Sequence, residues 1–398
     1  MSRLDYKRKR EKELARKMSG ESAFLSFVKE HSGLIALAVI VAVVAAAALI
    51  IGFNPDFADR FANKEGESIY LDENTLFETP VTSYEKIKIR PSGSGFVIYD
   101  GEKMKMFSDG GKVEWELDMV MNNPVLSSEG GYIMAADRGG KDIYLINNGK
   151  VILKTLSQYN IINASVAADG KFVVISDEPY FKSLITVKDA GDKEIFVWHS
   201  GSSYIVDAVI GSDANKLAAA VLSTEEQSGF SGGVMLFNLY DEEPYKTQMF
   251  EGCLASNVFR ADKGFTVVTD KKAVFLNSDG EILNEHGYNG KSINKICKSA
   301  DMTVLSLEAE NGSKSITALD NAGKLKCSFN VHRSPNFLSA DSGRIAYGGG
   351  NEVAVCDDSG KELYLIQTAK DFETLAFLGG ARRAAALSPT SLDIIEIK

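Results

Sequence analysis

The chain has 398 residues, a net charge of −10, 44% apolar residues and 25% charged residues. This composition is typical of a folded globular protein and excludes a collagen-like or low-complexity chain. The negative charge argues against a nucleic-acid-binding protein, because phosphate contacts need a positively charged surface.

Positive charge is concentrated at the N-terminus and is followed by an apolar run. Residues 1–32 hold nine Lys or Arg and five acidic residues, and residues 34–51 are only Leu, Ile, Ala and Val. As a helix, residues 33–53 extend about 31 Å at roughly 1.5 Å per residue, which matches a bilayer core of about 30 Å. The apolar run of a cleaved signal peptide is shorter, about 7–15 residues. We therefore predict an uncleaved signal anchor at 33–53, with the basic tail 1–32 in the cytoplasm and the rest of this single-pass chain outside the cell membrane.

The predicted membrane helix offers two kinds of partner. The first is the lipid bilayer, and the basic tail suits the anionic headgroups of the cytoplasmic leaflet. The second is another copy of the chain, because Ala38, Ala42 and Ala46 recur every four residues. Small residues at this spacing let two helices approach closely, so this stripe is the candidate contact of a weak homodimer.

Beyond a polar stalk at residues 54–68, short apolar runs alternate with turns rich in Gly, Asp and Asn. Eight runs occur, and they start near Phe96, Tyr132, Phe172, Leu217, Phe265, Thr303, Ile345 and Ala384. A period of about 40–45 residues with four short strands is typical of a propeller blade. We therefore predict an all-β fold over residues 69–398, an eight-bladed β-propeller preceded by one transmembrane α-helix. Seven blades are the alternative if one copy is irregular.

The strands of one blade and the closure of the ring follow from the same pattern. One blade is outlined by residues 124–128, 132–136, 142–147 and 150–155. The last copy has room for three strands only, at 375–378, 384–387 and 392–397. We predict that residues 68–71 supply its missing outer strand, which would close the ring and leave no free sheet edge.

A turn with Asp or Asn before Gly follows most copies, as at residues 109–112 and 147–150. Such turns supply the positive φ angles that a tight hairpin needs. The fourth copy lacks the turn and has residues 238–244 in its place. The side chain four residues after the Gly is predicted to dock between blades; these positions are Trp115, Leu153, Asn284, Cys327 and Tyr364, with Phe196 in a copy that has one extra residue.

The turn and its docking position resemble the tryptophan-docking motif of quinoprotein-type (PQQ-like) propellers, and the repeat is similar to that of WD40-like propellers. The resemblance covers residues 69–398 and implies the fold, although only the first copy keeps the Trp. A quinone cofactor would need a stacking Trp, metal-binding carboxylates and usually an adjacent Cys pair. The chain has two Trp and no adjacent Cys pair, so no cofactor is expected. The layout also resembles single-pass envelope proteins of Gram-positive bacteria, and the fold resembles the propeller lipoprotein of the outer-membrane β-barrel assembly machine, although no lipidation Cys is present.

The sequence shows no catalytic or metal-binding set. Residues 229–233 match G-x-S-x-G, but a nucleophile elbow needs a helix after its Ser, and Ser231 is predicted in a loop between strands. The four His residues lie far apart, without metal-ligand spacing. The four Cys are expected to be structural rather than disulfide-bonded. We therefore expect no enzyme activity, no cofactor and no metal.

A candidate binding face is formed by the loops between the second and third strands of each blade and those that join successive blades. These loops carry Tyr, Phe, His and Arg, which interfaces favour; the candidates are Arg138, Tyr159, Tyr180, Phe181, His199, Tyr204, Phe230, His286, Tyr288, His332 and Arg333. We expect a non-catalytic binding or scaffold module of the bacterial cell envelope, with envelope proteins or a peptide or glycan ligand as partners. The alternatives are a transmembrane receptor acting through a cytoplasmic partner and, third, a propeller hydrolase or lyase.

Overall fold

The computed structural model describes residues 67–70, 75–81, 83–224, 229–332 and 335–397. The predicted basic tail, the membrane helix with its alanine stripe, and the stalk up to residue 66 lie outside these residues. Within the described ranges, no helix is both long enough and apolar enough to span a bilayer. Residues 65–398 form one unit of the chain.

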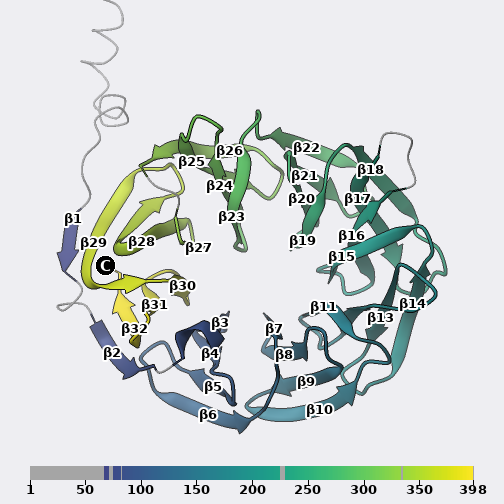
Figure 1. Cartoon of the computed structure of the whole chain (residues 1–398), viewed down its shortest axis with the longest axis horizontal. Helices are drawn as coiled ribbons and strands as arrows, with labels where there is room; N and C mark the ends of the chain where they lie inside the picture. Colours follow the sequence, from purple (N-terminus) through teal and green to yellow (C-terminus); the bar gives the residue numbers. More distant parts are fainter. Residues whose placement is uncertain (1–66, 71–74, 82, 225–228, 333–334, 398) are drawn as a thin grey trace, which may run out of the picture. The chain divides into compact units, whose positions relative to one another are not determined.

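The described residues fold into eight four-stranded sheets around a central axis, an eight-bladed β-propeller (Figure 1). The predicted all-β fold and the count of eight blades are confirmed, and the seven-bladed alternative is wrong. Each sheet has its innermost strand beside the central axis and its outermost strand at the rim of the propeller. The only helical element among the described residues is a short 3-10 turn, η1 (Tyr84–Lys86).

Six blades are continuous in sequence. Blades 1 to 3 are β3 (Lys88–Ser92), β4 (Gly95–Tyr99), β5 (Lys103–Phe107), β6 (Val113–Asp118); β7 (Pro124–Glu129), β8 (Tyr132–Asp137), β9 (Asp142–Asn147), β10 (Lys150–Leu156); and β11 (Ile161–Val166), β12 (Phe172–Ser176), β13 (Ser183–Lys188), β14 (Glu194–Ser200). Blades 4 to 6 are β15 (Ser203–Ile210), β16 (Lys216–Ser223), β17 (Ser231–Asn238), β18 (Lys246–Glu251); β19 (Ala255–Ala261), β20 (Gly264–Thr269), β21 (Lys272–Asn277), β22 (Ile282–Gly287); and β23 (Ser292–Lys298), β24 (Met302–Glu308), β25 (Lys314–Asp320), β26 (Leu325–Val331). The four strands outlined from the sequence for blade 2 agree with the structure to within one residue at each end.

The last two blades recruit strands from the N-terminal side of the propeller. Blade 7 is β27 (Phe337–Asp341), β28 (Arg344–Asp357), β29 (Glu362–Phe372) and β1 (Glu67–Tyr70); blade 8 is β30 (Thr374–Leu378), β31 (Arg383–Leu387), β32 (Ser391–Glu396) and β2 (Thr75–Pro80). The missing outer strand of the last blade is therefore β2, which pairs antiparallel with β32. The prediction that residues 68–71 fill this place is wrong, because β1 pairs parallel with β29 in the neighbouring blade.

Blade 7 counts four strands only with β1, but β28 folds back on itself and so supplies two strand segments of this blade. A Cβ placed on Gly348 would lie only 2.2 Å from the carbonyl oxygen of Glu352, whereas residues four apart in a straight strand are separated by about 13 Å. The first half of β28 pairs with β27 and the second half with β29. β1 is thus an extra strand on the rim of blade 7, and β2 is the strand that closes the ring.

The core lies between the blades. The described residues form eight apolar clusters, and each joins two neighbouring blades, including blades 8 and 1. The second strands are therefore buried on both faces; β12 and β20 are buried at every position. This explains why they are unbroken apolar or small runs in the sequence, with no polar alternation.

The loops divide the propeller into two faces. The linker face carries the loops that join successive blades, such as residues 119–123 and 157–160, and those between the second and third strands, such as 177–182. The turn face, on the opposite side, carries the turns between third and fourth strands, such as 108–112 and 147–149.

Candidate functional site

The six predicted docking side chains all lie at the outer part of a blade, toward the following blade. A Cβ on Gly149, whose φ is +71°, would lie 2.6 Å from Cδ1 of Trp115 in the preceding blade, so the indole ring occupies the space above this turn. Asn284 uses a hydrogen bond instead, because its Nδ2 donates to the carbonyl oxygen of Gly323 at 2.8 Å. The others belong to the apolar clusters between blades; they are Leu153, Phe196, Cys327 and Tyr364.

Two docking positions were missed from the sequence. Phe77 of β2 fills the place above the first turn, since a Cβ on Gly111 would lie 2.3 Å from its Cγ atom. In the fourth blade, Lys246 lies against the turn at Gly280. A signal existed for Phe77: the Gly111 turn needs a docking side chain, and no blade precedes it in the sequence.

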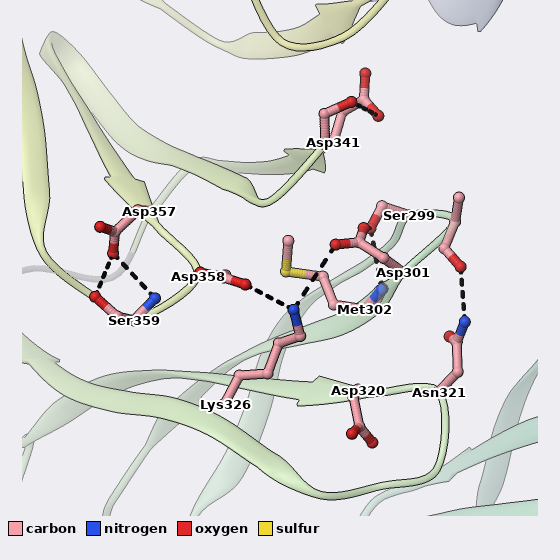
Figure 2. A network of polar contacts seen from close by, with 12 residues as sticks. Ser299, Asp301, Met302, Asp320, Asn321, Lys326, Asp341, Asp357, Asp358 and Ser359 are labelled. Atoms are coloured by element: carbon pink, nitrogen blue, oxygen red, sulfur yellow. Dashed lines mark hydrogen bonds and ion pairs between the residues drawn. The ribbon is translucent and has the colours of Figure 1, made fainter.

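Acidic residues of the turn face join blades rather than form an open site (Figure 2). Lys326 of blade 6 lies between Asp358 of blade 7, at 2.7 Å, and Asp301, at 3.9 Å. The hydrogen bond with Asp358 raises the pKa of Lys326. The carboxylates of Asp320 and Asp357 accept backbone N–H groups of their own turns. This acidic cluster therefore has a structural explanation.

The linker face carries an exposed aromatic patch over blades 3 and 4, formed by Tyr180, Phe181, Tyr204 and Phe230. Their exposed fractions range from 39% for Phe230 to 92% for Tyr180. Tyr204 is the second residue of β15 and Phe230 directly precedes β17, so both lie at the linker-face side of blade 4, with β16 between their strands. Large apolar side chains gathered in this way on one face are typical of an interaction surface.

Polar contacts position two of these aromatic rings. His199 Nδ1 lies 2.7 Å from Oε2 of Glu178, which is 7% exposed, and the imidazole lies 4.9 Å from the ring of Phe181. The ammonium group of Lys182 lies 4.7 Å from the ring centre of Tyr204, at cation–π distance. The imidazole, held by this buried carboxylate, therefore supports the ring of Phe181.

The other predicted face residues are not part of this patch. The Nε of Arg138 donates to the carbonyl oxygen of Ile162, and Tyr159 contacts its neighbour Gln158. Tyr288 is 2% exposed and packs between blades 5 and 6, so it does not belong to the surface. The remaining three are His286, which is half-buried, His332, which is exposed, and Arg333, which lies outside the described residues.

A polar chain links the inner strands of blades 3 to 5. Nδ2 of Asn163 donates to Oδ1 of Asp207 at 2.8 Å, and the backbone N–H of Val258 donates to Oδ2 at 3.0 Å. Burial raises the pKa of Asp207 to about 6, although hydrogen bonds from Val258, Ala208 and Asn257 act in the opposite direction. This carboxyl group thus joins three blades.

In the part of the chain that the structure describes, the remaining side chains that could carry chemistry form no catalytic grouping. Among the described residues, no three His, Cys, Asp or Glu are placed to hold a metal ion. Ser231 of the G-x-S-x-G match begins strand β17 rather than preceding a helix, and its hydroxyl is buried. All four Cys are free thiols, and burial raises the pKa of Cys297 and Cys327 to about 11.

The family of the chain follows from comparison with known proteins. A family model described as "Family of unknown function (DUF5711)" matches residues 67–397, which is the whole propeller. The chain belongs to the DUF5711 family. No curated protein sequence matches this DUF5711 protein.

Solved propeller structures share the fold of this DUF5711 protein. BamB from Moraxella catarrhalis is 12% identical, with a TM-score of 0.54 over 81% of this chain and 99% of BamB. The C-terminal WD40 domain of Sif2 is 11% identical, with a TM-score of 0.60 over 84% of this chain and 100% of that domain. The computationally designed Ika8 protein is 11% identical, with a TM-score of 0.60 over 83% and 100%. The expected likeness to PQQ-like and WD40-like propellers is therefore confirmed for the fold, and at these identities for the fold alone.

Proposed function

We propose that this DUF5711 protein is a non-catalytic binding module of the bacterial cell envelope, held at the membrane by residues 33–53 and displaying its propeller outside. The apolar run of 18 residues after a basic tail supports the anchor and its orientation. The partner is an envelope protein or a peptide or glycan ligand.

The aromatic patch is the observation that carries this proposal. Tyr180 is 92% exposed beside Phe181, Tyr204 and Phe230, although an isolated protein gains nothing from placing such rings in water. Rigid aromatic side chains supply large contact area at low entropic cost, which is why they dominate binding hot spots. The blades beneath them are sheets packed against one another in a closed ring, so the patch is presented on a packed support.

Site-specific photo-crosslinking in intact cells tests the proposal. A photoreactive amino acid replaces Tyr180 in the full chain, and a matched variant carries it at Tyr240, which is 72% exposed on the turn face. The proposal predicts a discrete crosslinked partner from position 180 that is absent from position 240 and is lost when Phe181→Ala and Tyr204→Ala are added. Identical crosslinking from both positions would contradict it.

A further inference from the structure

The central channel contains a pocket on the side of blades 8, 1 and 2. Its volume is about 450 Å³, within the range of small-molecule sites. Most of its wall is apolar and comes from the innermost strands and the link into blade 1; the main apolar residues are Tyr84, Ile87, Ile89, Leu126, Ala376 and Leu387. The lining residues of β3, β7 and β30 fall among the first three of each strand, so the pocket extends inward from the linker face.

The channel is crossed beyond this pocket. Arg260 of blade 5 makes an ion pair with Glu129 of blade 2. Blades 3 and 4 lie between these two blades around the ring, so the pair spans the channel (Figure 1). Glu129 is the last residue of β7, at the turn-face end, whereas the pocket residues of β7 lie at its linker-face end. The pocket therefore opens at the linker face and has the bridge behind it.

Two cationic side chains of β3 line the pocket, Lys88 and Arg90. Residues two apart on a strand point to the same side, and both side chains are exposed. Within the described part of the chain, neither side chain has a hydrogen bond or an ion pair, whereas Arg260 is paired with Glu129. The guanidinium of Arg90 is turned toward the channel, because its electrostatic neighbours are Glu129 and, on the inner strand of blade 6, Cys297.

The surroundings of Arg90 strengthen its attraction for an anion. Although Arg90 is exposed to the channel, desolvation by the surrounding inner strands lowers its pKa, and the carboxylate of Glu129 acts in the opposite direction. An arginine stays protonated at neutral pH even so. A charge that has lost part of its hydration and makes no hydrogen bond or ion pair is stabilised by an incoming anion more than a fully hydrated surface charge is.

We propose that this pocket binds a small organic ligand through an oxyanion, a carboxylate or a phosphate group, held by Arg90 with Lys88 beside it. The planar guanidinium matches two oxygens of either group, and the apolar wall receives the organic part of the ligand. Glu85 and Glu373 also line the pocket, and both are exposed. These carboxylates disfavour ligands with several negative charges, so a ligand with a single anionic end fits best. The site is separate from the aromatic patch on blades 3 and 4.

Calorimetric titration of the full chain in lipid nanodiscs tests the proposal with three matched probes. Benzoate and phenyl phosphate share a ring and differ in the oxyanion, and benzyl alcohol has the ring without the charge. We expect saturable binding of at least one anionic probe, with the tighter of the two showing which oxyanion the site prefers. Arg90→Gln is expected to weaken that binding at least tenfold, and Lys88→Gln severalfold. Arg382→Gln, the same change at an exposed arginine of the turn face, is expected to leave it unchanged.

Several results would overturn the assignment. They are the absence of saturable binding for both anions, equal affinity in the unmodified chain and Arg90→Gln, or benzyl alcohol binding as tightly as benzoate. If Arg90→Gln does not fold, Lys88→Gln and Arg90→Lys carry the test. Lys88→Gln removes one of the two positive charges, and Arg90→Lys keeps the charge but removes the planar guanidinium. Loss of the aromatic patch through Tyr180→Ala is expected to leave probe binding unchanged, so the two proposals fail independently.

Discussion

The closure of the ring depends on one side chain that bridges its two ends. Phe77 of β2 belongs to blade 8 by its backbone pairing, yet its ring lies 5.9 Å from that of Phe107 in blade 1 and covers the turn at Gly111. It also packs against the apolar cluster that joins blades 8 and 1. We predict that Phe77→Ala lowers the free energy of unfolding by about 2–3 kcal/mol, somewhat below the 3–5 kcal/mol typical of a fully buried Phe, because Phe77 is only partly buried.

The same strand provides a matched control. Leu76 is adjacent, 44% exposed and on the opposite side of β2, so Leu76→Ala should cost about 0.5 kcal/mol or less. Urea unfolding of the full chain, followed by tryptophan fluorescence, measures both variants. Equal losses from the two substitutions would refute the reasoning, because closure would then not depend on the contact between blades 8 and 1.

Shortening the chain separates the roles of β1 and β2. A chain that begins at residue 74 loses β1 and keeps β2, so we expect it to remain monomeric in size-exclusion chromatography. A chain that begins at residue 83 loses both strands and exposes the edge of β32, which is expected to aggregate. Aggregation of the chain that begins at residue 74 would contradict this, because closure would then also need β1.

Two further predictions concern the junctions between blades. Gly149→Ala should destabilise the propeller by about 1–3 kcal/mol more than Gly131→Ala, because both residues have positive φ but only the first Cβ meets Trp115; equal unfolding midpoints would contradict this. Asp207→Asn tests the buried carboxyl group, whose pKa is raised to about 6 by burial. Native Asp207 holds a proton between about pH 4 and 6 that the unfolded chain has released, so its contribution to stability falls as the pH rises through this window. Relative to the unmodified chain, Asp207→Asn should therefore gain up to roughly 3 kcal/mol between pH 4 and pH 7 in urea titrations, and a constant difference would contradict the assignment.

The blades were predictable because their signals are local. Each strand is bounded by a turn residue with a backbone requirement of its own, so the four strands of blade 2 could be outlined within a residue. The contact between Trp115 and the Gly149 turn follows from a fixed spacing after a glycine.

The closure and the channel pocket depend on long-range geometry and were not predictable in this way. β1 and β2 are both short strand-forming segments, and nothing in either says which of β29 and β32 it pairs with. Because β28 folds back on itself, it supplies two strand segments of blade 7, and β1 is added at the edge of β29. Likewise Lys88 and Arg90 look like ordinary surface residues of a strand until the ring places them beside the axis.

The proposed function depends most directly on which side of the membrane holds the propeller. Labelling of intact cells with a membrane-impermeant amine reagent, followed by mass spectrometry, measures this. The proposal predicts that Lys112, which is exposed on the turn face, is modified in intact cells, whereas Lys7 and Lys12 react only after lysis. Modification of Lys7 and Lys12 in intact cells, with protection of Lys112, would contradict it.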